Sequence, residues 1–159
     1  MSRLKDFINI DKRFQNSINL QLDIQNKNKV DGYIPTRSSI KILDGFLENV
    51  LENKENSNVL IGPYGKGKSH LLLVLLAILS DKTGENTKSI ITKIGEVSGS
   101  TGNKAKTFIE KQRPLLPVII SGIDRDLNHG FIAGLVESLK RNNLMDIAPD
   151  SYYGKAVET

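Results

Sequence analysis

The sequence contains no cysteine and no tryptophan, and only two of its 159 residues are histidine. Without cysteine the chain can form no disulfide framework, no thiolate metal site and no cysteine nucleophile. No apolar run approaches the roughly 20 residues needed to cross a bilayer, and the N-terminus lacks the apolar region of a signal peptide. These absences predict a cytoplasmic protein with no membrane partner.

The residues that are present are typical of a globular protein that can build a core. Hydrophobic residues make up 38% of the chain and charged residues 25%, close to the averages for globular domains. Lysine and arginine number 22 against 18 aspartate and glutamate, which gives a net charge of +4. This mild excess fits a solvated, lysine-rich surface as well as a face that attracts phosphate, so composition leaves direct contact with nucleic acid open.

One segment carries a specific motif. Residues 62–69 fit G-x-x-x-x-G-K-[ST] at every position, follow the short apolar run 58–61 and precede an apolar helix predicted over 68–80. Strand, glycine-rich loop and helix in this order are typical of the Walker A phosphate loop of nucleotide-binding proteins. The cofactor-binding residues predicted here are Gly62, Pro63, Tyr64, Gly65, Lys66, Gly67, Lys68, Ser69 and His70.

Each residue type in the motif has a physical role. Lys68 is the predicted catalytic residue, because its charge reaches the β- and γ-phosphates, and Ser69 offers a hydroxyl ligand to Mg²⁺. The predicted cofactors are therefore ATP and Mg²⁺. Lys66 faces either solvent or phosphate, and Tyr64 packs on either the nucleotide or a neighbouring chain. His70 has no predicted catalytic role, and helix packing is its alternative.

The segment Gly32-Tyr33-Ile34-Pro35-Thr36, followed by an amphipathic helix predicted over 38–52, resembles a segment of AAA+-type ATPases. In that family an extended segment crosses the nucleotide site and apolar residues contact adenine. The resemblance implies that Tyr33 and Ile34 contact the base. The alternative is that they attach an N-terminal arm to the core.

Together with residues 61–72 and 116–121, this segment resembles the N-terminal nucleotide-binding part of large bacterial P-loop ATPases. These ATPases belong to phage-defence and DNA-modification systems of the BREX type. The resemblance implies an ATPase domain linked to DNA handling, with other subunits of a defence or DNA-modification assembly as partners. It also implies that the chain is truncated at its C-terminus, because the distal elements of such ATPases lie downstream.

Hydrolysis needs an acidic residue at the end of an apolar strand. The candidates are Asp124 and Asp126, and an acidic helix start is their alternative. Residues 28–31 spell N-K-x-D, the guanine-reading motif of GTPases, and we interpret them as coincidence because no apolar strand precedes them. A small metabolite kinase and a non-hydrolysing, nucleotide-dependent interaction module are the alternative functions.

The predicted fold is α/β, a P-loop NTPase-like parallel sheet with flanking helices, incomplete in its distal half. Residues 1–32 form an N-terminal arm or strand, and residues 33–159 form the nucleotide-binding domain. Alternation and apolar runs predict strands over 18–24, 58–61 and 115–121. A turn is expected over 25–29, a loop over 95–106 and a helix from residue 126 or 128 to 142, while 89–94 fits a strand or a helix.

Overall fold

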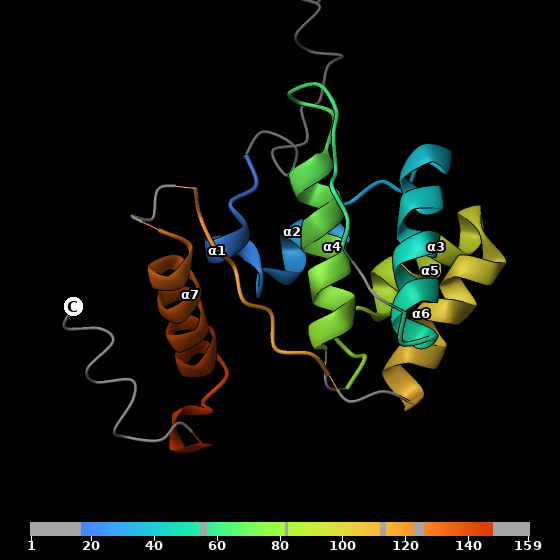
Figure 1. The fold of residues 1–159 in the computed structure, drawn as a ribbon. Coiled ribbons are helices and arrows are strands. Elements are labelled where there is room, and N and C mark those ends of the chain that lie inside the picture. The colour runs from blue at the N-terminus through green and yellow to red at the C-terminus, as the bar shows by residue number, and fades with distance from the viewer. Residues whose placement is uncertain (1–16, 55–56, 82, 112–113, 123–125, 148–159) are drawn as a thin grey trace, which may run out of the picture. The chain divides into compact units, whose positions relative to one another are not determined.

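All the regular secondary structure in the described part of the chain is helical (Figure 1). The computed structural model describes residues 17–54, 57–81, 83–111, 114–122 and 126–147. These residues form seven α-helices and one short 3₁₀ helix, η3. The elements are α1 (Leu20–Asp23), α2 (Lys27–Asp31), α3 (Arg37–Leu51), α4 (Lys68–Ser80), α5 (Lys88–Val97), α6 (Gly99–Lys111), α7 (Leu127–Arg141) and η3 (Met145–Ile147). The chain divides into two compact units, Met1–Arg113 and Pro114–Thr159.

Helix α4 is the centre of the first unit. Its apolar residues run almost all round the helix, and six of its thirteen residues are buried. The helix contacts α1, α2, α3 and α6, as expected for a helix that must cover several apolar faces at once. The prediction of a buried helix over 68–80 is confirmed.

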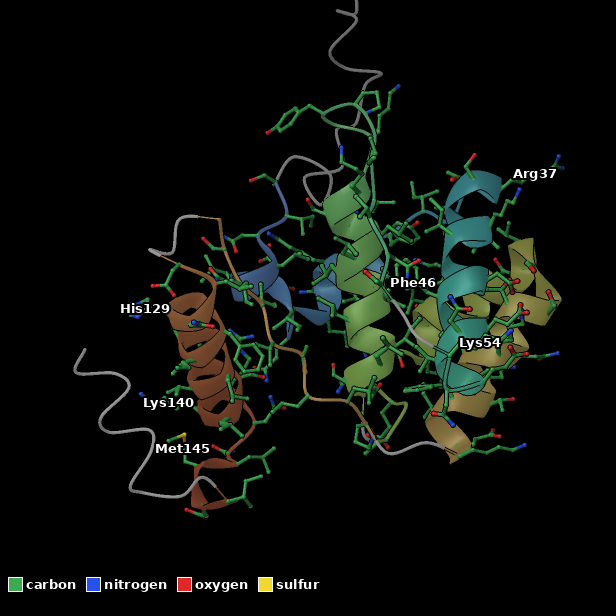
Figure 2. All side chains as sticks on the ribbon, viewed as in Figure 1. Arg37, Phe46, Lys54, His129, Lys140 and Met145 are labelled. Atoms are coloured by element: carbon green, nitrogen blue, oxygen red, sulfur yellow. The ribbon has the colours of Figure 1, made fainter. Side chains whose placement is uncertain are left out.

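Helix α3 begins at a capping box. The Ser39 backbone N–H donates to Thr36 Oγ1 at 3.2 Å, and the Thr36 N–H donates to Ser39 Oγ at 3.0 Å, so two donors at the helix start are satisfied. Ile40, Leu43 and Leu47 form its buried stripe. The helix predicted over 38–52 is confirmed, and Figure 2 shows Arg37 at its first turn.

Helices α5 and α6 pack closely, and here the prediction of a loop over 95–106 is wrong. A Cβ on Gly102 would lie 2.8 Å from the Gly95 Cα atom, so the two glycines let the helix backbones approach each other. Thr101, which is buried, donates from Oγ1 to Asp44 Oδ1 at 2.9 Å. The small and polar residues that indicate a loop are used instead for helix packing. Residues 89–94, which fit either structure, are helical.

The N-terminal segment also differs from its prediction. Residues 20–23 form α1 and residues 27–31 form α2, so the strand expected over 18–24 and the turn expected over 25–29 are wrong. Asn19 and Asn26 cap the two helices by accepting backbone N–H groups, a local bond that favours a helix start over an extended chain.

The predicted α/β fold is wrong as well, because the described residues contain no strand. Residues 58–61 and 115–120 are drawn as a plain tube, neither helix nor strand (Figure 1), and no backbone hydrogen bond links them to another described segment. Apolar composition predicts a strand only where a neighbouring strand completes the ladder. Val59 and Ile61 instead leave 84% and 88% of their surface exposed.

The described part of the second unit contains residues 114–122, which form no helix or strand, together with helix α7 and η3. Ser138 Oγ donates to the Pro117 carbonyl at 2.6 Å, and a Cβ on Gly134 would lie 2.7 Å from the Ile119 carbonyl oxygen. Residues 117–119 therefore lie directly against α7. The helix predicted from residue 126 or 128 to 142 is confirmed, and Figure 2 shows His129 near its start.

Among the described residues, no helix combines the length and apolar character required to cross a membrane.

The close packing of α5 on α6 predicts that alanine substitutions at two helical glycines change the free energy of unfolding in opposite directions. Gly102→Ala places a methyl group against the Gly95 backbone and lowers the free energy of unfolding by about 1–3 kcal/mol. Gly45→Ala on α3 meets nothing within 4 Å and raises the free energy of unfolding by roughly 0.5–1 kcal/mol. Urea denaturation measures both values. Equal effects of the two substitutions would contradict the packing.

The ion pairs between α3 and α6 predict a pH dependence of stability. Lys104 Nζ donates to Asp44 Oδ2 at 2.9 Å and to Glu48 Oε2 at 2.7 Å. The hydrogen bond from Lys104 lowers the pKa of Asp44 below its ordinary value of 3.8. A lowered carboxyl pKa adds stability above 3.8 that is lost as the pH falls through the folded-state pKa.

We therefore expect the acid-induced loss of unfolding free energy to be shallower in Asp44→Asn than in the wild type. Glu110→Gln, which removes an exposed carboxylate from α6, is the control and keeps the wild-type slope. Urea denaturation at a series of pH values below 5 measures the slopes. A wild-type slope in Asp44→Asn would show that this pair does not couple folding to pH.

Candidate functional site

Residues 62–67 form an exposed loop that leads into α4. Gly65 and Gly67 have φ angles of +75° and +81°, in the left-handed region that side chains with a Cβ rarely adopt. Gly67 is the N-cap residue of α4 and has no side chain to cap the helix. The glycine spacing of the motif is therefore what the observed turn requires at these two positions.

Lys68, the first residue of α4, folds its side chain back over the loop. Its ammonium group donates to the Gly62 carbonyl at 2.6 Å and to the Pro63 carbonyl at 2.7 Å. An ammonium group has three N–H donors, so a third remains for another acceptor. The side chain thus ties the start of the loop to the start of the helix and places a positive charge between them.

The first turn of α4, next to this charge, has backbone N–H groups without a partner in the helix. Leu71 makes the first backbone bond of the helix, to the Gly67 carbonyl at 2.9 Å. The N–H groups of Lys68, Ser69 and His70 precede it and have no acceptor within the helix. Such groups, together with the helix dipole, favour an anion. Ser69 is exposed, so its hydroxyl is accessible beside them.

A cavity of about 440 Å³ lies against this loop and helix. That volume falls within the range of roughly 300–1,000 Å³ typical of small-molecule sites. Three segments, 32–42, 60–63 and 66–71, contribute to its walls. The lining residues are Gly32, Tyr33, Ile34, Thr36, Ser38, Ser39, Ile42, Leu60, Ile61, Gly62, Pro63, Lys66, Gly67, Lys68, His70 and Leu71.

The chemistry of the cavity changes from one wall to the other. The loop and the start of α4 contribute the ammonium groups of Lys66 and Lys68, and none of the lining residues is acidic. The segment before α3 and its first turns contribute Tyr33, Ile34 and Ile42. Ile34 and Ile42 keep much of their surface exposed, whereas Tyr33 is only 6% exposed. The positive charge therefore lies on the wall formed by the loop and the start of α4, which also contributes Leu60, Ile61, Pro63 and Leu71. We call this wall the cationic end. The wall of Tyr33, Ile34 and Ile42, which also holds Thr36, Ser38 and Ser39, carries no charge, and we call it the apolar end.

Tyr33 is fixed in its wall by burial and by the imidazole of His70. The two ring centroids lie 5.0 Å apart with their planes at 75°, an edge-to-face arrangement that aromatic rings favour. Burial raises the pKa of Tyr33 above its ordinary value, and a hydrogen bond with Ser39 partly opposes this shift. The phenol therefore stays neutral at neutral pH and presents an uncharged ring.

Most of the predicted site residues meet at this cavity, although they come from two separate parts of the sequence. The cavity brings together Tyr33, Ile34, Gly62, Pro63, Lys66, Gly67, Lys68 and His70. Tyr64 is fully exposed, and it lies with Gly65 and Ser69 outside the lining residues. Sequence reasoning did not assign the other eight lining residues to the site: Gly32, Thr36, Ser38, Ser39, Ile42, Leu60, Ile61 and Leu71. Ile42 could have been predicted from the sequence, because it is an apolar residue of α3 that lies outside the buried stripe of that helix.

The other predicted functional residues lie elsewhere or outside the described residues. Asp126 belongs to the second unit and caps α7, since its Oδ1 accepts the His129 N–H at 2.8 Å. This is the helix-start role that was its alternative. Asp124 falls outside the described residues. The N-K-x-D residues form part of α2.

No family model matches the chain, and neither the curated proteins nor the solved structures contain a match to it.

The left-handed glycine at the start of α4 predicts a selective cost of substitution. Gly67→Ala forces an L-residue to φ near +81° and lowers the free energy of unfolding by roughly 1–2 kcal/mol. Gly62→Ala is the control, because its Cβ would lie 3.7 Å from Lys68 Cδ, an ordinary contact. Chemical denaturation distinguishes the two. A larger cost for Gly62→Ala would contradict the loop conformation.

Proposed function

We propose that this chain binds a nucleoside triphosphate, with ATP and Mg²⁺ as its ligands, in the cavity beside residues 62–69. The observation that carries the proposal is the meeting of the glycine-lysine motif with Tyr33 and Ile34 around one nucleotide-sized cavity. The two features are about 30 residues apart in the sequence. The motif was predicted from its own residues, and the role of Tyr33 and Ile34 from the resemblance to AAA+-type ATPases.

The cationic end fits a chain of phosphates. Lys68 keeps one N–H donor beyond its two loop carbonyls, and the first N–H groups of α4 have no acceptor within the helix. Charge-assisted hydrogen bonds of this kind are among the strongest that proteins make to phosphate. Lys66 adds a second positive charge to the cavity wall.

The apolar end fits a planar base. Ile34, which is 64% exposed, and Ile42 offer apolar surface that a base would remove from water. The neutral ring of Tyr33 forms part of the same wall. The resemblance of this segment to that of AAA+-type ATPases supports adenine as the base, although the sheet of that family is not the fold described above.

Ser69 is the residue that fits Mg²⁺. Its exposed hydroxyl follows Lys68 directly, and Mg²⁺ takes oxygen ligands, usually from few protein groups together with phosphates and water. Among the described residues no group of three or more histidine, aspartate or glutamate side chains gathers around a common point. A bound Mg²⁺ would offset phosphate charge at this end of the cavity.

The proposal concerns binding. Hydrolysis would need an acid to position water and metal, and Asp124 lies outside the described residues while Asp126 caps a helix. A role in DNA handling or phage defence, with other subunits as partners, rests on the resemblance of the sequence to the large bacterial ATPases.

The proposal predicts that Lys68→Ala weakens binding of Mg-ATP by roughly 10- to 100-fold, because a charge-assisted hydrogen bond to phosphate is lost. Lys106→Ala, which removes an exposed lysine on α6, is the matched control and keeps the wild-type affinity. Isothermal titration calorimetry gives both dissociation constants, and circular dichroism checks the fold of each variant. A folded wild-type protein that does not bind Mg-ATP, or equal affinities of wild type and Lys68→Ala, would refute the proposal.

A further inference from the structure

His70 links the first turn of α4 to the segment that forms the opposite wall of the cavity. Its Nε2 atom lies 2.6 Å from the Lys29 carbonyl oxygen. A carbonyl oxygen can only accept a hydrogen bond, so Nε2 must carry the proton and donate it. The end of α4 that carries the phosphate loop is therefore bonded to the backbone of α2.

The same imidazole also contacts Tyr33, the second residue after α2. Tyr33 lies edge-to-face with His70 at 5.0 Å. Between the two contacts the chain makes a tight turn, in which Gly32 donates to the Asn28 carbonyl at 2.9 Å and Tyr33 to the Val30 carbonyl at 3.1 Å. One side chain of the phosphate-loop helix thus holds both ends of this turn.

The turn is anchored on its other sides as well. Lys29 Nζ donates to Asp23 Oδ2 at 2.6 Å and to the Ser17 carbonyl at 3.1 Å. Lys93 of α5 donates to the Asp31 carbonyl. Contacts from α1 and α5 thus hold α2 in place. The bond from His70 to α2 then holds the first turn of α4 at a fixed distance from α2.

We propose that His70 is a positioning residue that holds Tyr33 and Ile34 at a set distance from the phosphate loop. In this way His70 makes the cavity prefer a nucleoside triphosphate over inorganic tripolyphosphate. The inference rests on the proposed function. A tripolyphosphate needs only the cationic end, whereas a nucleotide needs both ends at a fixed separation. A change in the separation of the ends therefore alters the affinity for the nucleotide and leaves the affinity for tripolyphosphate unchanged.

The test measures dissociation constants of Mg-ATP and of inorganic tripolyphosphate for the wild type and His70→Ala. We expect the wild type to bind Mg-ATP more tightly than tripolyphosphate. In His70→Ala the affinity for Mg-ATP falls roughly tenfold, because a hydrogen bond and an aromatic contact are lost. The affinity for tripolyphosphate stays within about twofold. His129→Ala, which changes the other histidine on α7, leaves both affinities unchanged.

Two further variants separate the hydrogen bond to Lys29 from the ring contact with Tyr33. They also test the inference if His70→Ala disturbs folding. His70→Gln keeps an N–H donor near the Nε2 position but loses the ring, and His70→Phe keeps the ring but loses the donor. Each is expected to lose part of the preference for Mg-ATP. An equal loss for both ligands, or no loss for either, would overturn the positioning role while leaving the proposed function standing. Failure of the wild type to bind either ligand would overturn the proposed function and this inference with it.

Discussion

The burial of α4 is the constraint on which the first unit depends. Its surface is apolar nearly all round, so four other helices must cover it, and this fixes where α1, α2, α3 and α6 lie. Only its first turn stays polar and open, because Gly67 cannot cap it and Lys68 reaches back over the loop. A buried helix thus begins with N–H groups that have no acceptor within the helix and with a positive charge beside them, features that favour an anion.

The parts of the fold that could be predicted from sequence are those decided by local signals. Helix α3 has a Thr36–Ser39 capping box and one apolar stripe, and α7 has Asp126 at its N-cap. The failures come from residues whose role depends on a neighbour. The alternation of apolar and polar residues over 18–24 is typical of a strand, but the side chains of Asn19 and Asn26 cap helix starts here, and the chain is helical. Gly95 and Gly102 resemble loop residues, but they permit two helices to cross closely. Residues 58–61 have strand composition without a described partner strand.

The candidate site was predictable to a greater extent than the fold around it. Its central residues lie in one contiguous motif, and the geometry of that motif needs only glycines at left-handed positions and a helix start. The proximity of Tyr33 to the loop could be expected only from the resemblance to AAA+-type ATPases. The bond from His70 to the Lys29 carbonyl had no sequence signal, because the two residues are 41 positions apart and the acceptor is backbone.

The central claim is that the first turn of α4 and its loop bind the phosphates of a nucleotide. Backbone amide chemical shifts, followed by NMR during titration with Mg-ATP, test it most directly. The account predicts that the largest shifts arise at Gly65, Gly67, Lys68 and Ser69, with Ile34 changing at the same apparent dissociation constant. Amides of α7 should not change. Saturating Mg-ATP that leaves the loop amides unmoved, or that moves α7 most, would contradict the account.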